Sequence, residues 1–182
     1  MKKISYDLEY YLNLKKQHKK TEKIIFPIRW NFVKEIDFKV VLDYGCGCGE
    51  LSKYAPKDVI IDTYDIGKLN GKSYPQTGIK HDKYDVIFFY DVIEHIDWRY
   101  APDLDILDIL EKTGCIVASV PILPENRDLK TWRHYKPGEH LTIFNEKSLE
   151  DFFVKLGFKL IKKGYPECPP RSDIITMVLE KI

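Results

Sequence analysis

Three glycines at alternate positions, Gly45, Gly47 and Gly49, closely follow a short apolar run that ends at Asp43. Glycine lets the backbone turn sharply and lets a ligand approach where a Cβ atom would collide with it. The apolar run predicts a buried parallel strand, and the residues from Glu50 onward predict a helix whose free N–H groups face the loop. Together these features predict a cradle for a ligand.

The residue at position 50 separates the ligands that such a loop could bind. The dinucleotide fingerprint places glycine at the first, third and sixth positions, and the sixth position here is Glu50, an acid where a pyrophosphate would lie. NAD and FAD are therefore disfavoured. Asp43 instead suits a positively charged or amino-bearing ligand. A tight glycine turn that binds nothing is the alternative.

A second acid follows at the spacing that a nucleotide site requires. Residues 59–66 predict a strand that closes at Asp65, roughly 20 residues after Asp43, where a doubly wound site sets an acid against ribose hydroxyls. A carboxylate can accept hydrogen bonds from both hydroxyls. An ordinary turn aspartate is the alternative.

The stretch from Tyr84 to Ile96 is the second strong motif. Its apolar residues Val86 to Tyr90 predict a central strand, so Asp91 to His95 lie just past the carboxyl end of that strand. Open α/β sheets bind ligands where the strand order reverses. We therefore expect this segment to lie beside the glycine loop.

The rest of the chain alternates between helical and strand-like segments. We expect helices at 6–20, 26–36, 98–111 and 147–156, and strands at 114–121, 158–162 and 174–180. Asn145 is the expected cap of the last helix. The alternation predicts an α/β fold with one mostly parallel sheet and an antiparallel terminal strand. We expect a helical segment at 1–37 on the cofactor side, before a domain at 38–182.

Composition restricts the environment and the partners. The 182 residues include 29 lysines and arginines and 28 acids, so no strong global field favours nucleic acid or a membrane surface. No apolar run reaches membrane-spanning length, and the N-terminus lacks the apolar core of a signal peptide. The four cysteines form no C-x-x-C pair, which fits a reduced, cytoplasmic setting. Seven lysines among the first 23 residues could form a nucleic-acid arm, although a solvated helix face is the common outcome.

The two motifs together resemble those of class I S-adenosylmethionine-dependent methyltransferases, from about Pro27 to the end of the chain. The glycine stretch resembles D/E-x-G-x-G-x-G after a strand, and the second motif resembles F-D-x-V…D-V-L-E-H-I. The likeness leans toward the ubiquinone-biosynthesis O-methyltransferases. It implies a Rossmann-like fold, S-adenosylmethionine as cofactor with S-adenosylhomocysteine as product, and methyl transfer to a small-molecule acceptor, with O-methylation favoured.

One segment departs from that family. Residues 67–83 are too few for the helix, strand and helix that a usual member places there, so we expect mostly loop and a shortened third-strand region. How the adenine is held on this side is therefore left open.

The resemblance assigns roles to single residues. Pro27-Ile28-Arg29 matches a Pro-x-Arg whose arginine reaches the cofactor's carboxylate, a surface arginine being the alternative. Asp65 would take the ribose, Ile66 would lie against the adenine, and Tyr90 would flank the sulfonium with Asp91. The expected cofactor-binding residues are Arg29, Asp43, Gly45, Cys46, Gly47, Gly49, Asp65, Ile66, Tyr90 and Asp91.

Methyl transfer from a sulfonium needs accurate positioning and a base for a protonated acceptor. His95 is the expected base, with a structural histidine as the alternative, and Asp91 and His140 complete the candidate catalytic set. We expect Glu94 to orient a loop or cap the following segment.

A divalent metal is the sharper option for the same residues. The ubiquinone-type enzymes and the small-RNA 2′-O-methyltransferases hold a metal with E-x-x-E-H and a later histidine. The matching residues here are Asp91, Glu94, His95 and His140. The first acid is the shorter aspartate, and we do not favour a metal.

Two rival functions remain open. One is RNA 2′-O-methylation with a metal, supported by the basic N-terminus. The other is a non-catalytic interaction domain, supported by the shortened edge. The loop Thr131–Thr142 mixes aromatic and cationic residues and would suit an aromatic or anionic acceptor. We expect a monomer or homodimer, and the sequence does not identify the acceptor.

Overall fold

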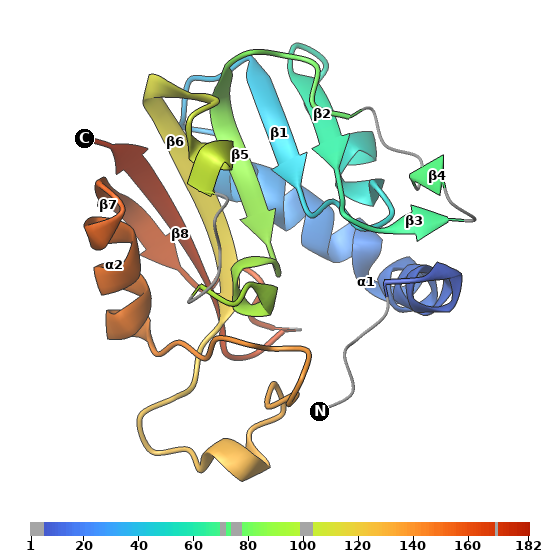
Figure 1. The fold of residues 1–182 in the computed structure, drawn as a ribbon, viewed down its shortest axis with the longest axis vertical. Helices are drawn as coiled ribbons and strands as arrows, with labels where there is room; N and C mark the ends of the chain where they lie inside the picture. The colour runs from blue at the N-terminus through green and yellow to red at the C-terminus, as the bar shows by residue number, and fades with distance from the viewer. Residues whose placement is uncertain (1–5, 70–71, 74–77, 99–103, 170) are drawn as a thin grey trace.

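The computed structural model describes residues 6–182 apart from 70–71, 74–77, 99–103 and 170. One six-stranded sheet, in the order β2-β1-β5-β6-β8-β7, forms its centre (Figure 1). The strands are β1 Val40–Tyr44, β2 Ile60–Tyr64, β5 Tyr84–Tyr90, β6 Leu110–Pro121, β7 Phe158–Gly164 and β8 Ile174–Lys181. The first four strands in this order are parallel, and β8 is antiparallel to both of its neighbours. The predicted fold class is confirmed.

The strand order reverses at β1. The chain leaves β1 for β2 on one side and later returns to place β5 on the other. Asp43 lies opposite Phe88 in the parallel register of β1 and β5. The glycine loop and the segment after Tyr90 therefore meet at one edge of the sheet, as the two motifs predicted.

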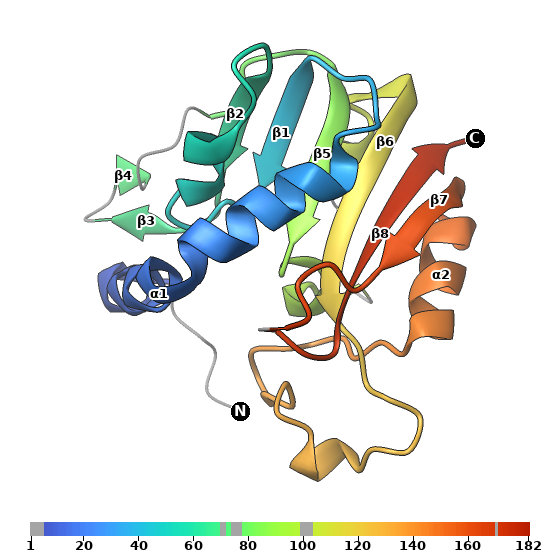
Figure 2. The same ribbon diagram turned by 180° about the vertical axis from the view of Figure 1, so that it is seen from behind.

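The N-terminal region forms one long helix instead of the two predicted. Helix α1 spans Leu8–Val33 and contains Pro27. Pro27 lacks a backbone N–H and so removes one hydrogen bond from the helix. The ribbon changes direction between the first turns of α1 and the straight segment that leads to β1 (Figure 2). Its C-terminal half buries Phe26, Trp30 and Val33 against the sheet. The division of the chain at residue 37 stays a prediction.

The other face of the sheet is covered mainly by α2, Glu146–Lys155. The predicted cap is confirmed: Asn145 accepts from the Ser148 N–H, and the Ser148 hydroxyl accepts from the Asn145 N–H. Leu149 and Phe153 from this helix join the larger core cluster on that face. None of the described helices is both long and apolar enough to span a membrane.

The helix predicted at 98–111 is wrong in its described part. Residues 99–103 lie outside the described residues, Leu104–Leu107 form a 3₁₀ helix, and β6 already begins at Leu110. The Tyr84 N–H donates to the Ile109 carbonyl at 2.8 Å, and Leu110 is buried opposite Tyr84. Sheet pairing with β5 thus overrides the helical spacing of the apolar residues.

The segment between β1 and β5 is reduced. The helix expected at Glu50 is a single 3₁₀ helix, Glu50–Tyr54, and β3 Lys68–Leu69 pairs only with β4 Lys72–Ser73. In the described part of the chain, the main sheet ends at β2. The Gly78 N–H donates to the Thr63 carbonyl at 3.1 Å, so backbone without a strand of its own borders β2. The shortened third-strand region is confirmed.

Candidate functional site

A cavity of about 670 Å³ opens at the carboxyl ends of β1, β2 and β5. Its size lies within the range of small-ligand sites. It is lined by most of the residues that the sequence singled out: Arg29, Asp43, Gly45, Cys46, Gly47, Asp65, Ile66, Tyr90, Asp91, Glu94, His95 and His140. Gly49 is not among the lining residues. Helix α1, from the segment expected on the cofactor side, forms a further wall of the cavity.

The glycine loop has the tight geometry that its sequence indicated. Gly45 has a φ of +77°, and a Cβ atom built on it would lie 2.4 Å from Cγ2 of Val92. Only glycine fits there without displacing the segment that follows β5. Gly49 has a φ of +73° and precedes the 3₁₀ helix, so the structure gives it a conformational role.

Asp65 lies where the ribose acid was predicted, and protein donors already reach its carboxylate. Oδ2 accepts from the Gly47 N–H at 2.8 Å, and Oδ1 accepts from the Gly67 N–H at 2.9 Å. The Tyr11 hydroxyl donates to Oδ1 at 2.5 Å. Burial and this hydrogen bond raise the pKa of Tyr11, so its hydroxyl stays a donor. Sequence reasoning missed Tyr11, because nothing in a Tyr/Lys-rich helix indicates a contact so far along the chain.

The other residues of the cofactor half differ in burial. Asp43 is only 3% exposed, and burial raises its pKa to about 7 although Arg29 opposes the shift. Burial, then Asp43, raises the pKa of the Cys46 thiol, which disfavours a nucleophilic thiolate. Ile66 lines the cavity with 61% of its surface exposed, so it offers apolar surface to a ligand.

Asp91 is held by two arginines. Arg171 donates to both of its carboxylate oxygens, at 2.6 and 2.9 Å, and Arg29 donates to Oδ2 at 2.8 Å. Burial alone would raise the pKa of Asp91, but Arg171 and Arg29 more than reverse this and hold it well below its usual range. The backbone of Asp91 has a φ of +59°, a strained conformation that occurs at functional sites. Its side chain therefore takes part in an ion pair and is not poised as a base.

Both Arg171 and its neighbour Glu167 come from the loop between β7 and β8. Glu167 is fully buried and accepts from Arg29 and Arg171, each at 2.7 Å. From the sequence, no site residue was predicted in this loop. Its only signal was an acid and an arginine four residues apart.

The residues Glu94, His95 and His140 gather at the other end of the cavity. One ligand atom from each lies within 4.8 Å of the others. Burial lowers the pKa of His95. The pKa of His140 is lowered to about 4, mainly by burial and secondly by the nearby His95. Burial and the nearby Asp91 raise the pKa of Glu94, and Oε2 of Glu94 has no hydrogen-bond partner among the described residues. Neutral imidazoles beside such an oxygen can accept a proton or bind a cation.

This donor set fits a divalent metal in part. Two imidazoles and a carboxylate are common ligands of Zn²⁺, Mn²⁺ and Fe²⁺. Three of the four predicted ligands lie together, whereas Asp91 is directed to the arginines instead.

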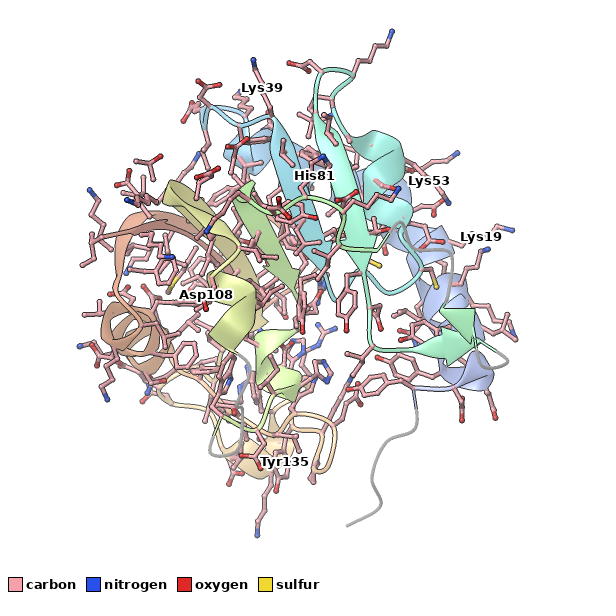
Figure 3. All side chains as sticks on the ribbon, turned by 45° about the horizontal axis from the view of Figure 1, so that its top comes forward. Lys19, Lys39, Lys53, His81, Asp108 and Tyr135 are labelled. Carbon is pink, nitrogen blue, oxygen red and sulfur yellow. The ribbon has the colours of Figure 1, made fainter. Side chains whose placement is uncertain are left out.

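The loop after β6 contributes less than its sequence indicated. His134, Lys136 and His140 line the cavity, as does Glu139, which pairs with Lys136 at 3.2 Å. Trp132 is buried beneath the loop, and Tyr135 lies at the end of the molecule away from the sheet (Figure 3). The loop therefore has a buried aromatic base and a polar rim that faces the cavity.

The comparisons with known proteins identify the family. A model described as "Methyltransferase domain" matches residues 17–163. The chain belongs to the methyltransferase domain family. A comparison with curated proteins finds no match.

Solved structures share the fold of this methyltransferase at low identity. A SAM-dependent methyltransferase from Archaeoglobus fulgidus has 15% identity and a TM-score of 0.68, over 94% of this chain and all of its own (100%). A 1,6-didemethyltoxoflavin-N1-methyltransferase from Burkholderia thailandensis, solved with S-adenosylhomocysteine, has 13% identity and a TM-score of 0.62, over 95% of this chain and 89% of its own.

Some matched proteins are much longer than this methyltransferase. The pyocyanin biosynthetic protein PhzM has 14% identity and a TM-score of 0.62, over 90% of this chain but 56% of its own. The chain likewise covers 55% of a protein from Nostoc punctiforme, so it spans about half the length of these two relatives. These likenesses establish the class I methyltransferase fold.

Proposed function

We propose that this methyltransferase transfers a methyl group from S-adenosylmethionine to a hydroxyl group of a small molecule. One observation carries the proposal. A single cavity joins the glycine loop and Asp65 at one end to Glu94, His95 and His140 at the other. Such a cavity can bind a nucleoside cofactor and bring an acceptor to basic groups.

The cofactor half offers a partner for each part of S-adenosylmethionine. The methionine part would follow Gly45 and Gly47, with its ammonium toward Asp43 and its carboxylate toward Arg29. Asp65 would accept from the ribose, and the exposed Ile66 would cover the adenine. The neighbour from Burkholderia thailandensis, with S-adenosylhomocysteine bound, supports this choice of cofactor.

The reaction needs one bond formed, one broken and one proton removed. The acceptor oxygen attacks the methyl carbon in line with the sulfur, and the carbon–sulfur bond breaks to leave the neutral thioether. The acceptor proton passes to His95, whose lowered pKa keeps the imidazole neutral and able to accept it. The Tyr6 hydroxyl lies 3.4 Å from Nδ1 of His95 and can orient the ring.

A metal would be an alternative to that base. Glu94, His95 and His140 would hold a divalent ion, and the ion would lower the pKa of an acceptor hydroxyl. The test is whether EDTA abolishes turnover and Mg²⁺ or Mn²⁺ restores it.

Binding and turnover test the proposal itself. Isothermal titration is expected to show binding of S-adenosylmethionine and S-adenosylhomocysteine, and absence of both would overturn the enzyme function. A screen of catechols, phenols, carboxylates and RNA ends with labelled cofactor would identify the acceptor class. Binding without turnover on any acceptor would favour the non-catalytic interaction domain. The lean toward ubiquinone-biosynthesis enzymes stays a prediction.

RNA methylation is a second candidate, supported by the outer face of α1. Five exposed lysines at helical spacing share one side of α1, and Lys19 points away from the molecule (Figure 3): Lys15, Lys16, Lys19, Lys20 and Lys23. The opposite side of the same helix lines the cavity with Leu14 and Thr21. Methylation of RNA ends that is lost when these lysines become glutamine would support it.

A further inference from the structure

Arg29 is oriented by a carboxylate from a distant part of the chain. Its Nε–H donates to Oε1 of Glu167 at 2.7 Å, and its Nη2 contacts Oε2 of Glu167 at 3.4 Å and Oδ2 of Asp91 at 2.8 Å. The guanidinium also lies over the ring of Tyr90, 4.3 Å from the centroid. A planar group bound along one edge and stacked on one face has little freedom to rotate.

The Nη1 group of this guanidinium is available to donate hydrogen bonds to a ligand. Arg29 carries five N–H groups, and those on Nη1 have no acceptor among the residues that the structure describes. Arg29 is 7% exposed and lines the cavity, so what little surface it has faces the ligand space. An N–H donor of a charged guanidinium at a cavity wall can form a charge-assisted hydrogen bond with a carboxylate oxygen.

Glu167 is itself held by hydrogen bonds from three residues, of which Arg29 is one. Its other contacts are Arg171, whose Nη1 lies 2.7 Å from Oε2, and the Ser119 hydroxyl, 3.3 Å from Oε1. Ser119 is in turn hydrogen-bonded to Thr176 on β8 at 2.7 Å. Two arginines and two acids (Asp91 and Glu167) balance one another, so the buried network is neutral without a ligand.

We infer that Glu167 is a positioning residue that holds Arg29 ready for the carboxylate of the cofactor's methionine part. The inference rests on the proposed function. The loop between β7 and β8 extends from the terminal hairpin toward the end of β5 (Figure 2). It thereby completes a cofactor site whose other parts come from β1, β2 and β5. A zwitterionic methionine end matches a neutral network, because it adds one charge of each sign.

Two ligands that differ only at the methionine end test the inference. S-adenosylhomocysteine carries the carboxylate, whereas 5′-methylthioadenosine keeps the adenosine and the sulfur but lacks the amino acid. In Glu167→Gln, the Kd for S-adenosylhomocysteine is expected to rise about tenfold, because a charge-assisted hydrogen bond loses its geometry. The Kd for 5′-methylthioadenosine is expected to stay within about twofold.

Matched variants separate positioning from general damage. Glu150→Gln makes the same chemical change on α2, where Glu150 pairs with Lys163 at 2.5 Å outside the cavity, and it is expected to leave both Kd values unchanged. Glu167→Asp keeps the charge but shortens the side chain, and its Kd ratio is expected between those of the wild type and Glu167→Gln. Thermal unfolding checks that each variant is folded.

The outcomes distinguish two kinds of failure. If the wild type binds neither ligand, the proposed function is overturned and this inference with it. If the wild type binds both and the ratio of the two Kd values is unchanged in both Glu167 variants, only the inference is overturned. Tighter binding of S-adenosylhomocysteine to Glu167→Gln would also overturn it, because Glu167 would then compete with the cofactor for Arg29.

Discussion

Replacing Tyr11 with phenylalanine removes the hydroxyl that donates to Asp65, the proposed ribose acid, and leaves the ring in place. The hydroxyl donates to Oδ1 of Asp65 at 2.5 Å, while the two backbone N–H groups of Gly47 and Gly67 keep their own contacts with that carboxylate. The ring packs so closely on Gly67 that a Cβ atom there would lie 2.1 Å from Cζ of Tyr11. The substitution therefore tests whether the hydroxyl holds a position that the ribose uses.

The expected effects on the free and the bound protein have opposite signs. A hydrogen bond to a charged group contributes about 1.5–3 kcal/mol, so the free energy of unfolding of Tyr11→Phe should fall by about that amount without ligand. A ribose hydroxyl that takes the vacated position restores the bond. Because the free protein loses the bond and the complex does not, affinity for S-adenosylhomocysteine should rise about tenfold.

Titration calorimetry and urea unfolding, each with and without S-adenosylhomocysteine, measure these effects. Tyr165→Phe is the matched control, because the exposed Tyr165 hydroxyl also donates to a carboxylate, that of Glu146 at 2.8 Å, away from the cavity. It should leave affinity unchanged and cost little stability. A fall in affinity confined to Tyr11→Phe would refute the reasoning, since the hydroxyl would then contribute to the bound state.

Three other perturbations address the loop, the buried acid and the base. Gly45→Ala should lower the unfolding free energy by about 1–3 kcal/mol more than Gly157→Ala, because both glycines have positive φ but only the first would meet a side chain; equal losses in urea would exclude the steric cause. Burial raises the pKa of Asp43 to about 7, so the folded state keeps a proton that the unfolded state loses near pH 4. The free energy of unfolding should therefore fall by up to about 4 kcal/mol as the pH rises from about 4 to about 7. This fall should be smaller in Asp43→Asn. An unchanged pH dependence of unfolding in Asp43→Asn would argue against that raised pKa. Once an acceptor is known, His95→Asn should reduce kcat by about 10²–10⁴-fold and leave the Kd for the cofactor unchanged. The control His81→Asn, whose histidine contacts Asp62 of β2, should leave kcat unchanged. Equal kcat values for the wild type and His95→Asn would show that His95 is not the base.

The sheet and its switch point could be predicted because they depend on local patterns. Apolar runs gave the strands, and the spacing of Asp43, Asp65 and Asp91 marked the ends of three of them. Most cavity residues followed from these positions, since parallel strands bring their carboxyl ends to one edge. Gly49 shows the limit of the pattern, because its glycine serves the backbone and not the cavity wall.

The remaining features depend on contacts between distant segments. Two helices were predicted at 6–20 and 26–36, yet packing of both parts of α1 against the rest of the chain sustains one bent helix. The contacts of Tyr11 with Asp65 and of Glu167 with Arg29 span 54 and 138 residues, which no local pattern encodes. For the same reason, the pairing of Asp91 with Arg171 could not be foreseen when Asp91 was considered as a metal ligand.

The two parts of helix α1 differ in local stability. Trp30 and Val33 are buried with the strands, so backbone amides near them can exchange with solvent only when the core itself opens. Tyr11 and its neighbours pack in a small separate cluster beside the cavity. The ordering of that half is thermodynamically linked to whatever occupies the cavity, so a bound ligand would slow amide exchange along the first turns of α1 while exchange beyond Pro27 stays governed by global unfolding.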